Sequence, residues 1–577
     1  GRALRRSLVS PLTDLAAIQS RHEAVGRLSE EVSLRHELRE ILKGVGDLER
    51  LTSKASSGRI NPREMGHIRR GLHAVQNVAD ATAGEESLIT YLVELSPCTE
   101  LLSRLDRELV AEPAAAIGKG EVIAAGVSEK LDEVRKLAFH SQEALDAIRD
   151  REAAATGISG LKIAFNNVFG YYLEVRNAHK DKVPSDWIRK QTLTQAERYI
   201  TQELKELEAQ ILNAREQAES LELTAFAALV AACVAEVASL MANAKALALL
   251  DMLASHAETA TELSYTRPRM KESQGIQISE GRHPVIERQL PPGETYVAND
   301  IQLDPETRQI LMVTGPNMSG KSALLRQTAL ISLMAQAGSF VPAKAADLGI
   351  LDRIFTRVGA SDNISSGEST FMVEMNETAA ILNNLTPRSL VLLDEIGRGT
   401  STYDGVSIAW AIAEHLHESR HAHPLTLFAT HYHELNDMSQ RFSRIVNVNV
   451  SVQEVNGKIV FLRKLAQGGS NHSFGIHVAQ LAGMPRSLVR RASEVLTTLE
   501  EARSSASTNS SLDLSDLGAS EGIQMSFFQL DDPSVEAIRD QIMEVDIDHL
   551  TPVQALMKLH EIKSTLTGKA STEGVKL

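Results

Sequence analysis

The sequence predicts a multidomain protein in which an all-α region with a small β-rich insertion precedes an α/β domain and a short helical tail. Three observations support this fold class. Apolar residues recur at three- and four-residue spacing over residues 1–157, strand-forming residues cluster over 158–200, and short apolar strands alternate with helical runs after residue 266. A chain of 577 residues is long enough for several such domains.

Composition limits the classes of function. The net charge is −15, so any contact with nucleic acid must come from a local basic surface rather than from overall attraction. Cys98 and Cys233 are the only cysteines, which excludes a disulfide framework and a four-thiolate zinc site and favours the reducing cytoplasm. The most apolar run, residues 223–235, is shorter than the roughly 20 residues of a membrane span, so we expect no membrane partner.

Residues 158–200 differ from the helical sequence on either side. Tyr171, Tyr172 and Val175 follow Gly170, which predicts short strands joined by a turn. Helical periodicity returns from about residue 196 to 257, a stretch without Pro or Gly. A single helix of that length would span roughly 90 Å at 1.5 Å per residue, so two long, packed helices are the expected arrangement.

The inserted segment is basic although the chain is acidic. Residues 161–200 contain seven Lys and Arg side chains against four Asp and Glu. Such a surface suits contacts with DNA phosphates that do not read bases, and an ordinary solvated charged surface is an equally good interpretation of the charge alone. The candidate DNA-binding residues are Lys180, Lys182, Arg189, Lys190 and Arg198.

A phosphate-binding motif follows the apolar strand at residues 310–313. The sequence GPNMSGKS fits G-x-x-x-x-G-K-[ST], and a helical run follows it, as the mechanism requires. Backbone N–H groups of such a loop surround phosphates, Lys321 supplies a cation and Ser322 offers a hydroxyl to Mg²⁺. The motif therefore predicts ATP and Mg²⁺ as cofactors. The nucleotide-binding residues are Gly315, Pro316, Asn317, Met318, Ser319, Gly320, Lys321 and Ser322.

Two carboxylates follow the apolar strand at residues 390–393. Asp394 and Glu395 would lie at the edge of a parallel sheet where ligands bind. We expect Asp394 to help hold Mg²⁺ and Glu395 to orient the water that attacks the γ-phosphate. Solvated acids at a strand end are the alternative, and the P-loop upstream favours the catalytic interpretation.

His431 follows another apolar strand, residues 425–429, which predicts that it reaches the same sheet edge. A zinc site is the alternative for His431 and His433. The H-E-x-x-H pattern fails because Asn436 and Asp437 stand where the motif would continue, so metal ligation is the less favoured interpretation.

These motifs together resemble the MutS family of DNA mismatch-repair ATPases. The resemblance rests in the ATPase region on GPNMSGKS, FMVEMNETA (371–379), LLDEIGRGTSTYDG (392–405) and FATHYHEL (428–435). In the inserted segment, GYYLEV (170–175) and QTLTQAERY (191–199) are similar to the family's clamp and to the start of its returning lever helix. The resemblance extends over nearly the whole chain.

The resemblance implies an ABC-type ATPase whose nucleotide lies between two subunits. It implies that Ser369 reaches a γ-phosphate in trans, that Tyr296 stacks on adenine and that His431 is a switch residue near the γ-phosphate. From the sequence alone, ordinary packing would be the simpler interpretation of Tyr296. It further implies a homodimer around double-stranded DNA that couples ATP hydrolysis to clamp state, a MutL-type repair partner and a cytoplasmic, nucleoid-associated location.

The resemblance also implies a division into domains. We expect a helical core and lever domain over 1–157, the clamp over 158–200, returning lever helices over 201–265, the ATPase and dimerisation domain over 266–502, a Ser-rich linker over 503–525 and C-terminal oligomerisation helices over 526–577. The last segment could support tetramers or could instead be a partner-binding motif.

Two departures from the family pattern affect the expectations. Ala323 stands where relatives usually carry a second hydroxyl, which removes a phosphate hydrogen bond worth on the order of 1 kcal/mol. The mismatch-reading Phe-x-Glu motif is absent from the sequence, so we expect a chain that begins at the lever domain without reader and connector domains. The alternatives are a meiotic or anti-recombination relative that binds DNA junctions and a non-hydrolysing structural clamp, which only Ala323 favours.

Overall fold

A computed structural model describes residues 1–507 except 140–141, 167, 169, 317–318, 360–369, 420, 456–457 and 470–474. The chain divides into two compact units, Gly1–Val489 and Arg490–Leu577. Of the predicted linker 503–525, residues 503–507 form the end of helix α18 (Arg486–Ser507). The rest of the linker and the predicted tail 526–577 lie outside the described residues.

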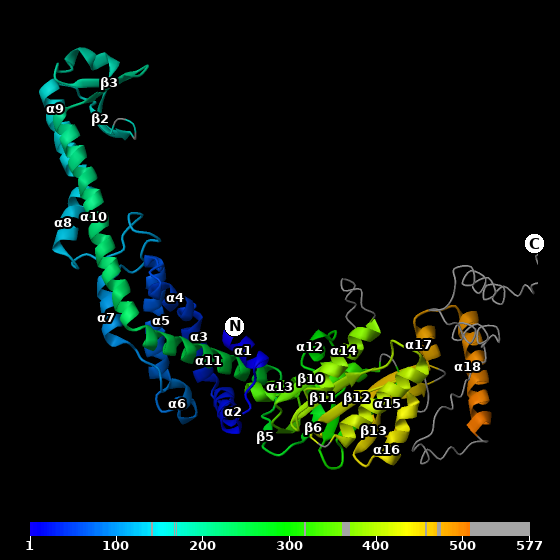
Figure 1. Ribbon diagram of the computed structural model, residues 1–577. Helices are drawn as coiled ribbons and strands as arrows, with labels where there is room; N and C mark the ends of the chain where they lie inside the picture. The colour runs from blue at the N-terminus through cyan, green and yellow to red at the C-terminus, as the bar shows by residue number, and fades with distance from the viewer. Residues whose placement is uncertain are drawn as a thin grey trace, which may run out of the picture. The chain divides into compact units, whose positions relative to one another are not determined.

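The first part of the chain is helical, as its apolar periodicity predicts. Local signals set the helix ends: Asn61 and Glu64 form a reciprocal capping box at the start of α5, and Pro62 occupies its first position. The helices are α1 (Arg2–Val9), α2 (Leu15–Glu30), α3 (Val32–Lys43), α4 (Leu48–Ser56), α5 (Pro62–Ala81), α6 (Glu86–Leu92), α7 (Thr99–Glu108), α8 (Glu129–Phe139) and α9 (Gln142–Thr156) (Figure 1).

Two long helices follow the insertion, as expected from the absence of Pro and Gly. They are α10 (Gln202–Ala235), which the Thr201 side chain caps, and α11 (Val237–Glu262). By length and apolar composition alone, both helices could cross a membrane. Part of their apolar surface packs within the helical region: Phe226 of α10 joins one core cluster, and Leu250 of α11 joins another with α2 and α5.

The insertion between α9 and α10 is an antiparallel sheet of four strands in the order β1-β2-β4-β3, called here the inserted sheet. It has a small core of its own, in which Leu173, Trp187 and Tyr199 pack together with residues of the adjoining helices. The strands are β1 (Lys162–Asn166), β2 (Gly170–Arg176), β3 (Ile188–Thr192) and β4 (Ala196–Ile200), and a 3₁₀ helix (Asn177–Lys182) joins β2 to β3.

The α/β region contains two sheets. The larger has the order β10-β11-β12-β8-β13-β14, and its strands are parallel except for the antiparallel pair β13 and β14. Its strands are β8 (Ile310–Thr314), β10 (Arg353–Arg357), β11 (Ser389–Asp394), β12 (Leu425–Ala429), β13 (Ile445–Val455) and β14 (Lys458–Gln467). The smaller sheet pairs β5 (Arg269–Lys271), β9 (Ala345–Gly349), β6 (Ile276–Gly281) and β7 (Asn299–Leu303) in that order.

The central strands of the larger sheet are buried, and the carboxyl ends of three of them form one edge of the candidate site. Residues of β8, β11 and β12 are buried on both faces, as expected for parallel strands between helical layers. The carboxyl ends of these three strands lie side by side and lead into the P-loop, Asp394 and Thr430. The helices are α12 (Ile286–Gln289), α13 (Lys321–Ala337), α14 (Thr370–Leu382), α15 (Thr402–Glu418), α16 (Met438–Arg441) and α17 (Gly475–Leu481) (Figure 1).

The helical and α/β regions exchange core residues at the C-terminal end of α13. Ile18 of α2 is fully buried in the core of the α/β region, and Phe340 is buried in the core of the helical region. Arg21 donates to the Ala337 carbonyl at 2.9 Å, and His22 Nε2 lies 2.9 Å from the carbonyl oxygen of Ala335. The carbonyl groups of Ala335 and Ala337, in the last turn of α13, therefore receive side-chain partners from α2.

Candidate ATPase site

The P-loop backbone adopts conformations that glycine permits. Gly315 has a φ of 139° and Gly320, the N-cap of α13, a φ of 103°. A Cβ at Gly315 would lie 3.3 Å from the Val450 carbonyl, so the loop passes close to β13. The N-terminus of α13 thus presents free N–H groups to an anion. Asn317 and Met318 of the motif lie outside the described residues, as does Ser369.

Lys321 is held inside the loop that it is expected to serve. Its side chain is only 4% exposed, and Nζ donates to the carbonyls of Gly315 at 2.7 Å and Pro316 at 3.1 Å. Glu395 Oε1 lies 3.7 Å from the same nitrogen. Burial lowers the pKa of Lys321, and the charges of Glu395 and Asp394 oppose that effect. The ammonium group is thereby kept next to the acids of the sheet edge.

Asp394 and Ser322 form a pair suited to a divalent cation. Burial raises the pKa of Asp394, and a hydrogen bond with Ser322 acts in the opposite direction. Asp394 Oδ1 is buried and has no hydrogen-bond partner among the described residues, so its lone pairs are available to a cation. The described residues contain no cluster of three or more His, Cys, Asp and Glu side chains that could hold a metal alone. The pair fits Mg²⁺ with further oxygens from phosphate and water.

Glu395 is fixed in an unusual backbone conformation at the start of the loop after β11. Its φ is 54°, a region that non-glycine residues seldom occupy, and its N–H donates to the Ala429 carbonyl at 2.9 Å. Arg398 donates to Glu395 Oε2 at 2.6 Å. The carboxylate is therefore oriented between two cations, Lys321 and Arg398, at the end of the sheet.

His431 lies among these charged groups, as its position after β12 predicts. Partial desolvation lowers its pKa, while the nearby Glu395 raises it and Arg398 and Lys321 lower it further. Its ring centre is 4.2 Å from that of the buried Tyr432. A lowered pKa favours the neutral imidazole, which can accept one hydrogen bond and donate another.

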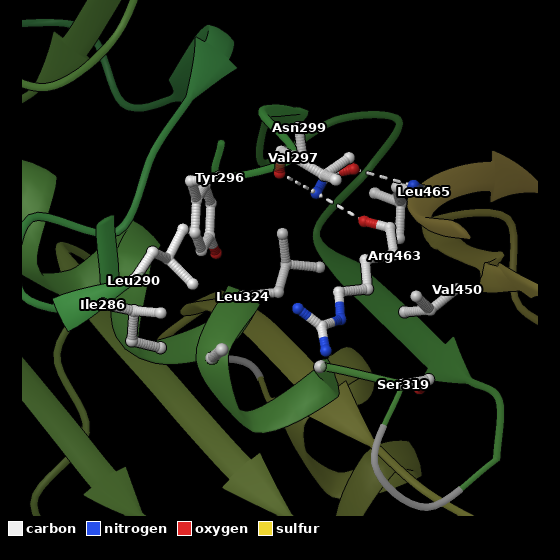
Figure 2. Close-up of a pocket in the computed structure, with 12 residues that line it drawn as sticks. Ile286, Leu290, Tyr296, Val297, Asn299, Ser319, Leu324, Val450, Arg463 and Leu465 are labelled. Carbon is white, nitrogen blue, oxygen red and sulfur yellow. Dashed lines mark hydrogen bonds between the residues drawn. The ribbon is translucent and has the colours of Figure 1, made fainter. Parts of the chain in front are cut away.

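A pocket beside the P-loop contains Tyr296. The Tyr296 hydroxyl donates to Gln327 Oε1 at 3.0 Å, and burial raises its pKa to about 12. Ile286, Leu290 and Leu324 make much of the wall apolar, as Figure 2 shows, and Ala323 also lines the pocket. An aromatic and aliphatic pocket next to the P-loop has the shape and lining that can accept a planar base.

Arg463 is a candidate residue that sequence reasoning missed. Figure 2 shows it on the side of the pocket opposite Tyr296, reaching in from β14. Asn299 holds this strand by donating to the Arg463 carbonyl at 2.9 Å and accepting from the Leu465 N–H at 2.7 Å. No motif marks Arg463 in the sequence, and only its positive φ of 54° and its pocket position single it out.

The predicted DNA-binding residues of the inserted sheet differ in availability. Lys180 and Lys190 are exposed, and Lys182 is exposed although its Nζ donates to the Gly157 carbonyl at 3.2 Å. Arg189 has a 61% exposed side chain and an ion pair with Glu197. The three lysines and Arg189 can therefore reach a ligand in solvent.

Arg198 is held within the inserted sheet. Its side chain is only 19% exposed, and it pairs with Glu174 at 3.4 Å and donates to Gln191 at 2.8 Å. Its guanidinium also lies 4.4 Å from the centre of the Tyr172 ring. These contacts leave Arg198 less available to a phosphate than its neighbours, because the cation already has partners.

Comparisons with known proteins place the chain in a family. The model of MutS domain III matches residues 1–257, and that of MutS domain V matches residues 311–500. The curated relatives include three proteins named DNA mismatch repair protein MutS. The one from Parabacteroides distasonis is 53% identical over 98% of this chain and 66% of its own length. The proteins from Phocaeicola vulgatus and Flavobacterium psychrophilum are 53% and 52% identical, over 98% and 99% of this chain and 65% of their own lengths. The chain thus spans about two thirds of the length of these relatives. The resemblance predicted from the motifs is confirmed, and the chain belongs to the MutS family, of which it carries domains III and V.

Proposed function

We propose that this chain is the ATP-hydrolysing and DNA-holding part of a mismatch-repair protein. The observation that carries the proposal is the convergence of Lys321, Asp394 and Glu395 at one sheet edge, next to the Tyr296 pocket. The name of the relatives, DNA mismatch repair protein MutS, supports the repair role. Family resemblance supports a homodimer around double-stranded DNA, a MutL-type partner and work in the cytoplasm.

In this proposal the P-loop binds the phosphates of ATP. Lys321 exchanges its contacts with the Gly315 and Pro316 carbonyls for phosphate oxygens, and the free N–H groups of α13 donate to the same anion. Ser322 and Asp394 would hold Mg²⁺, which neutralises charge on the phosphates when bound. The base enters the pocket between Tyr296 and Arg463.

Hydrolysis depends on Glu395. Its carboxylate accepts a hydrogen bond from water and orients it toward the γ-phosphate, and Arg398 keeps that carboxylate from rotating away. His431, kept neutral by its lowered pKa, can donate to the γ-phosphate or to the same water. In this proposal Glu395 aligns the water, and Lys321 supplies positive charge that neutralises the phosphate oxygens.

The inserted sheet serves as the DNA contact in this proposal. Lys180, Lys182, Arg189 and Lys190 provide exposed positive charge on a chain whose net charge is −15. Lysine side chains on a small domain bind phosphates without reading base edges, which suits a protein that must move along any sequence. Binding by this sheet alone should therefore be sensitive to salt and insensitive to sequence.

The decisive experiment measures ATP turnover and ATP binding by this chain and by Glu395→Gln. We expect the variant to bind ATP normally and to lose turnover by on the order of 10²-fold or more, because the aligned water is lost. Glu414→Gln, an exposed change on α15, serves as the control and should behave like the parent. Equal turnover by parent and Glu395→Gln would overturn the proposal and favour the non-hydrolysing clamp.

A further inference from the structure

A buried carboxylate outside the predicted catalytic set requires an explanation. Glu374 of α14 is 6% exposed and faces Arg357 Nη2 at 3.5 Å, and Arg357, at the end of β10, is 5% exposed. Arg357 also pairs with Glu377 at 3.0 Å. A buried ion pair often contributes no more stability than apolar residues of the same volume, so stability alone does not account for Glu374.

The second oxygen of Glu374 contacts the loop that follows Glu395. Glu374 Oε1 accepts from the Gly397 N–H at 2.5 Å. On the other side of this residue, the Tyr432 hydroxyl donates to the Gly397 carbonyl at 2.8 Å. Both polar backbone groups of Gly397 are thus held by buried side chains, two residues after Glu395. Hydrogen bonds to a charged acceptor are among the stronger ones in proteins.

The loop packs closely against the start of α15 at this point. Gly397 has a φ of 87°, and a Cβ there would lie 2.5 Å from the Gly405 carbonyl, so its backbone rests directly on the start of α15. Glu395 itself has a φ of 54°. A non-glycine residue keeps such a conformation only where its surroundings enforce it. The contacts of Gly397 with Glu374, Tyr432 and Gly405 are surroundings of this kind, two residues from Glu395.

We propose that Glu374 is a positioning residue of the ATPase site, which fixes the Gly397 peptide and thereby the orientation of the Glu395 carboxylate. The inference rests on the proposed function of Glu395. Among the described residues, the polar contacts of the Glu374 side chain are with Arg357 and Gly397, and it does not line the Tyr296 pocket, so we expect its effect on turnover and not on nucleotide affinity. Arg357, which ends the strand next to β11, provides the positive charge that pairs with Glu374.

The test compares three variants of the full chain in steady-state and single-turnover ATP hydrolysis. Glu374→Ala removes the Gly397 contact, and we expect kcat to fall by about 10-fold or more with the KM for ATP unchanged, as for a misaligned catalytic group. Glu374→Gln keeps an oxygen for the Gly397 N–H and should restore most of the turnover. Glu377→Gln is the matched control, since Glu377 lies on the same helix and pairs with the same arginine without contacting Gly397.

A double variant separates positioning from folding. Glu374→Met with Arg357→Met leaves no unpaired buried charge, so it should fold with the parental circular dichroism spectrum and still lose turnover. Parental kcat in a folded Glu374→Ala or double variant, alongside an inactive Glu395→Gln, would overturn this inference alone. Parallel losses of kcat and ATP affinity would also overturn it, because they indicate general disruption. Equal turnover by the parent and Glu395→Gln would overturn the proposed function and this inference together.

Discussion

Two acidic side chains on different sheets show opposite electrostatic behaviour. Asp394, at the end of β11, has a raised pKa because it is buried, and its Oδ1 has no partner in the described part of the chain. Glu197, on β4 of the inserted sheet, has a lowered pKa, first because the Tyr199 hydroxyl donates to it and also because Arg189 is near. One carboxylate has unused acceptor capacity, and the other is fully engaged by protein groups.

The difference is the one expected between an acid that binds a ligand, as we propose for Asp394, and an acid with a structural role. A buried carboxylate that lacks partners is unfavourable unless a cation or water completes it, whereas a carboxylate with partners holds neighbouring strands together. Asp394 lies where phosphate and Mg²⁺ are expected, and Glu197 lies inside a sheet whose proposed ligand binds on exposed lysines. Three variants test this contrast, with substitutions at Asp394, at the exposed lysines of the inserted sheet and at Glu197.

The largest effect is expected at Asp394. Because its pKa is raised, the ionised form is unfavourable in the folded protein at neutral pH, so Asp394→Asn should leave the melting temperature of the free protein unchanged or higher. The same change should remove the thermal stabilisation by Mg²⁺ and ATP and lower turnover by on the order of 10²-fold. Thermal shift with and without Mg²⁺ and ATP measures the melting temperature and its increase by ligand, and steady-state ATP hydrolysis measures turnover. Undiminished stabilisation by ligand would argue against the metal-binding role.

A smaller effect is expected from the exposed lysines of the inserted sheet. Affinity falls as salt rises, and changing Lys180, Lys182 and Lys190 to Ala together should make this dependence less steep. The slope of log affinity against log salt should become less negative by up to about three, since each lost phosphate contact contributes roughly 0.9. Duplexes of all sequences should weaken alike, and folding should be unaffected. Lys130 and Lys136 on α8, changed to Ala, are the control pair. A loss confined to mismatched duplex would contradict contact through phosphates.

The smallest effect is expected at Glu197, and it depends on pH. Its lowered pKa means that the contribution of its contacts to stability is complete above the ordinary pKa of 4.5 and is lost as the pH falls through the lower pKa of the folded state. Glu197→Gln should therefore lower the melting temperature of the inserted sheet at neutral pH, and the difference from the parent should shrink in acid. The ring centres of Trp187 and Tyr199 are 6.0 Å apart, so the fluorescence of Trp187 reports unfolding of the inserted sheet. Trp410, the second of the two tryptophans, is replaced by Phe to remove its signal. A difference that is constant with pH would exclude an ionic origin.

The sequence predicted the parts of the site that are local in the chain. A P-loop between strand and helix and an acidic pair after an apolar strand carry their own signals, so Lys321, Asp394 and Glu395 were accessible without a structure. Arg463 was not, because the Asn299 side chain that positions its strand is 164 residues away. The Gly397 contact of Glu374, 23 residues away, also depends on how α14 packs.

The same limit applies to the fold and to the inserted sheet. Periodicity predicted the helices and the two long helices after the insertion, since each signal spans only a few turns. Charge counting grouped Arg198 with the lysines, although the structure engages it with Glu174 and Tyr172. Net charge does not reveal which cations already have partners.

The exchange of Ile18 and Phe340 has a consequence for dissecting the chain. A fragment that began at residue 266 would lack Ile18, leaving a cavity in the α/β core, and would present the Phe340 ring to water. It would also leave the Ala335 and Ala337 carbonyls without the caps that α2 provides. The nucleotide-binding half is therefore completed by residues encoded some 300 positions earlier, as the 316-residue separation of Arg21 and Ala337 illustrates. A truncation that keeps α2 attached should be soluble where one that removes it aggregates.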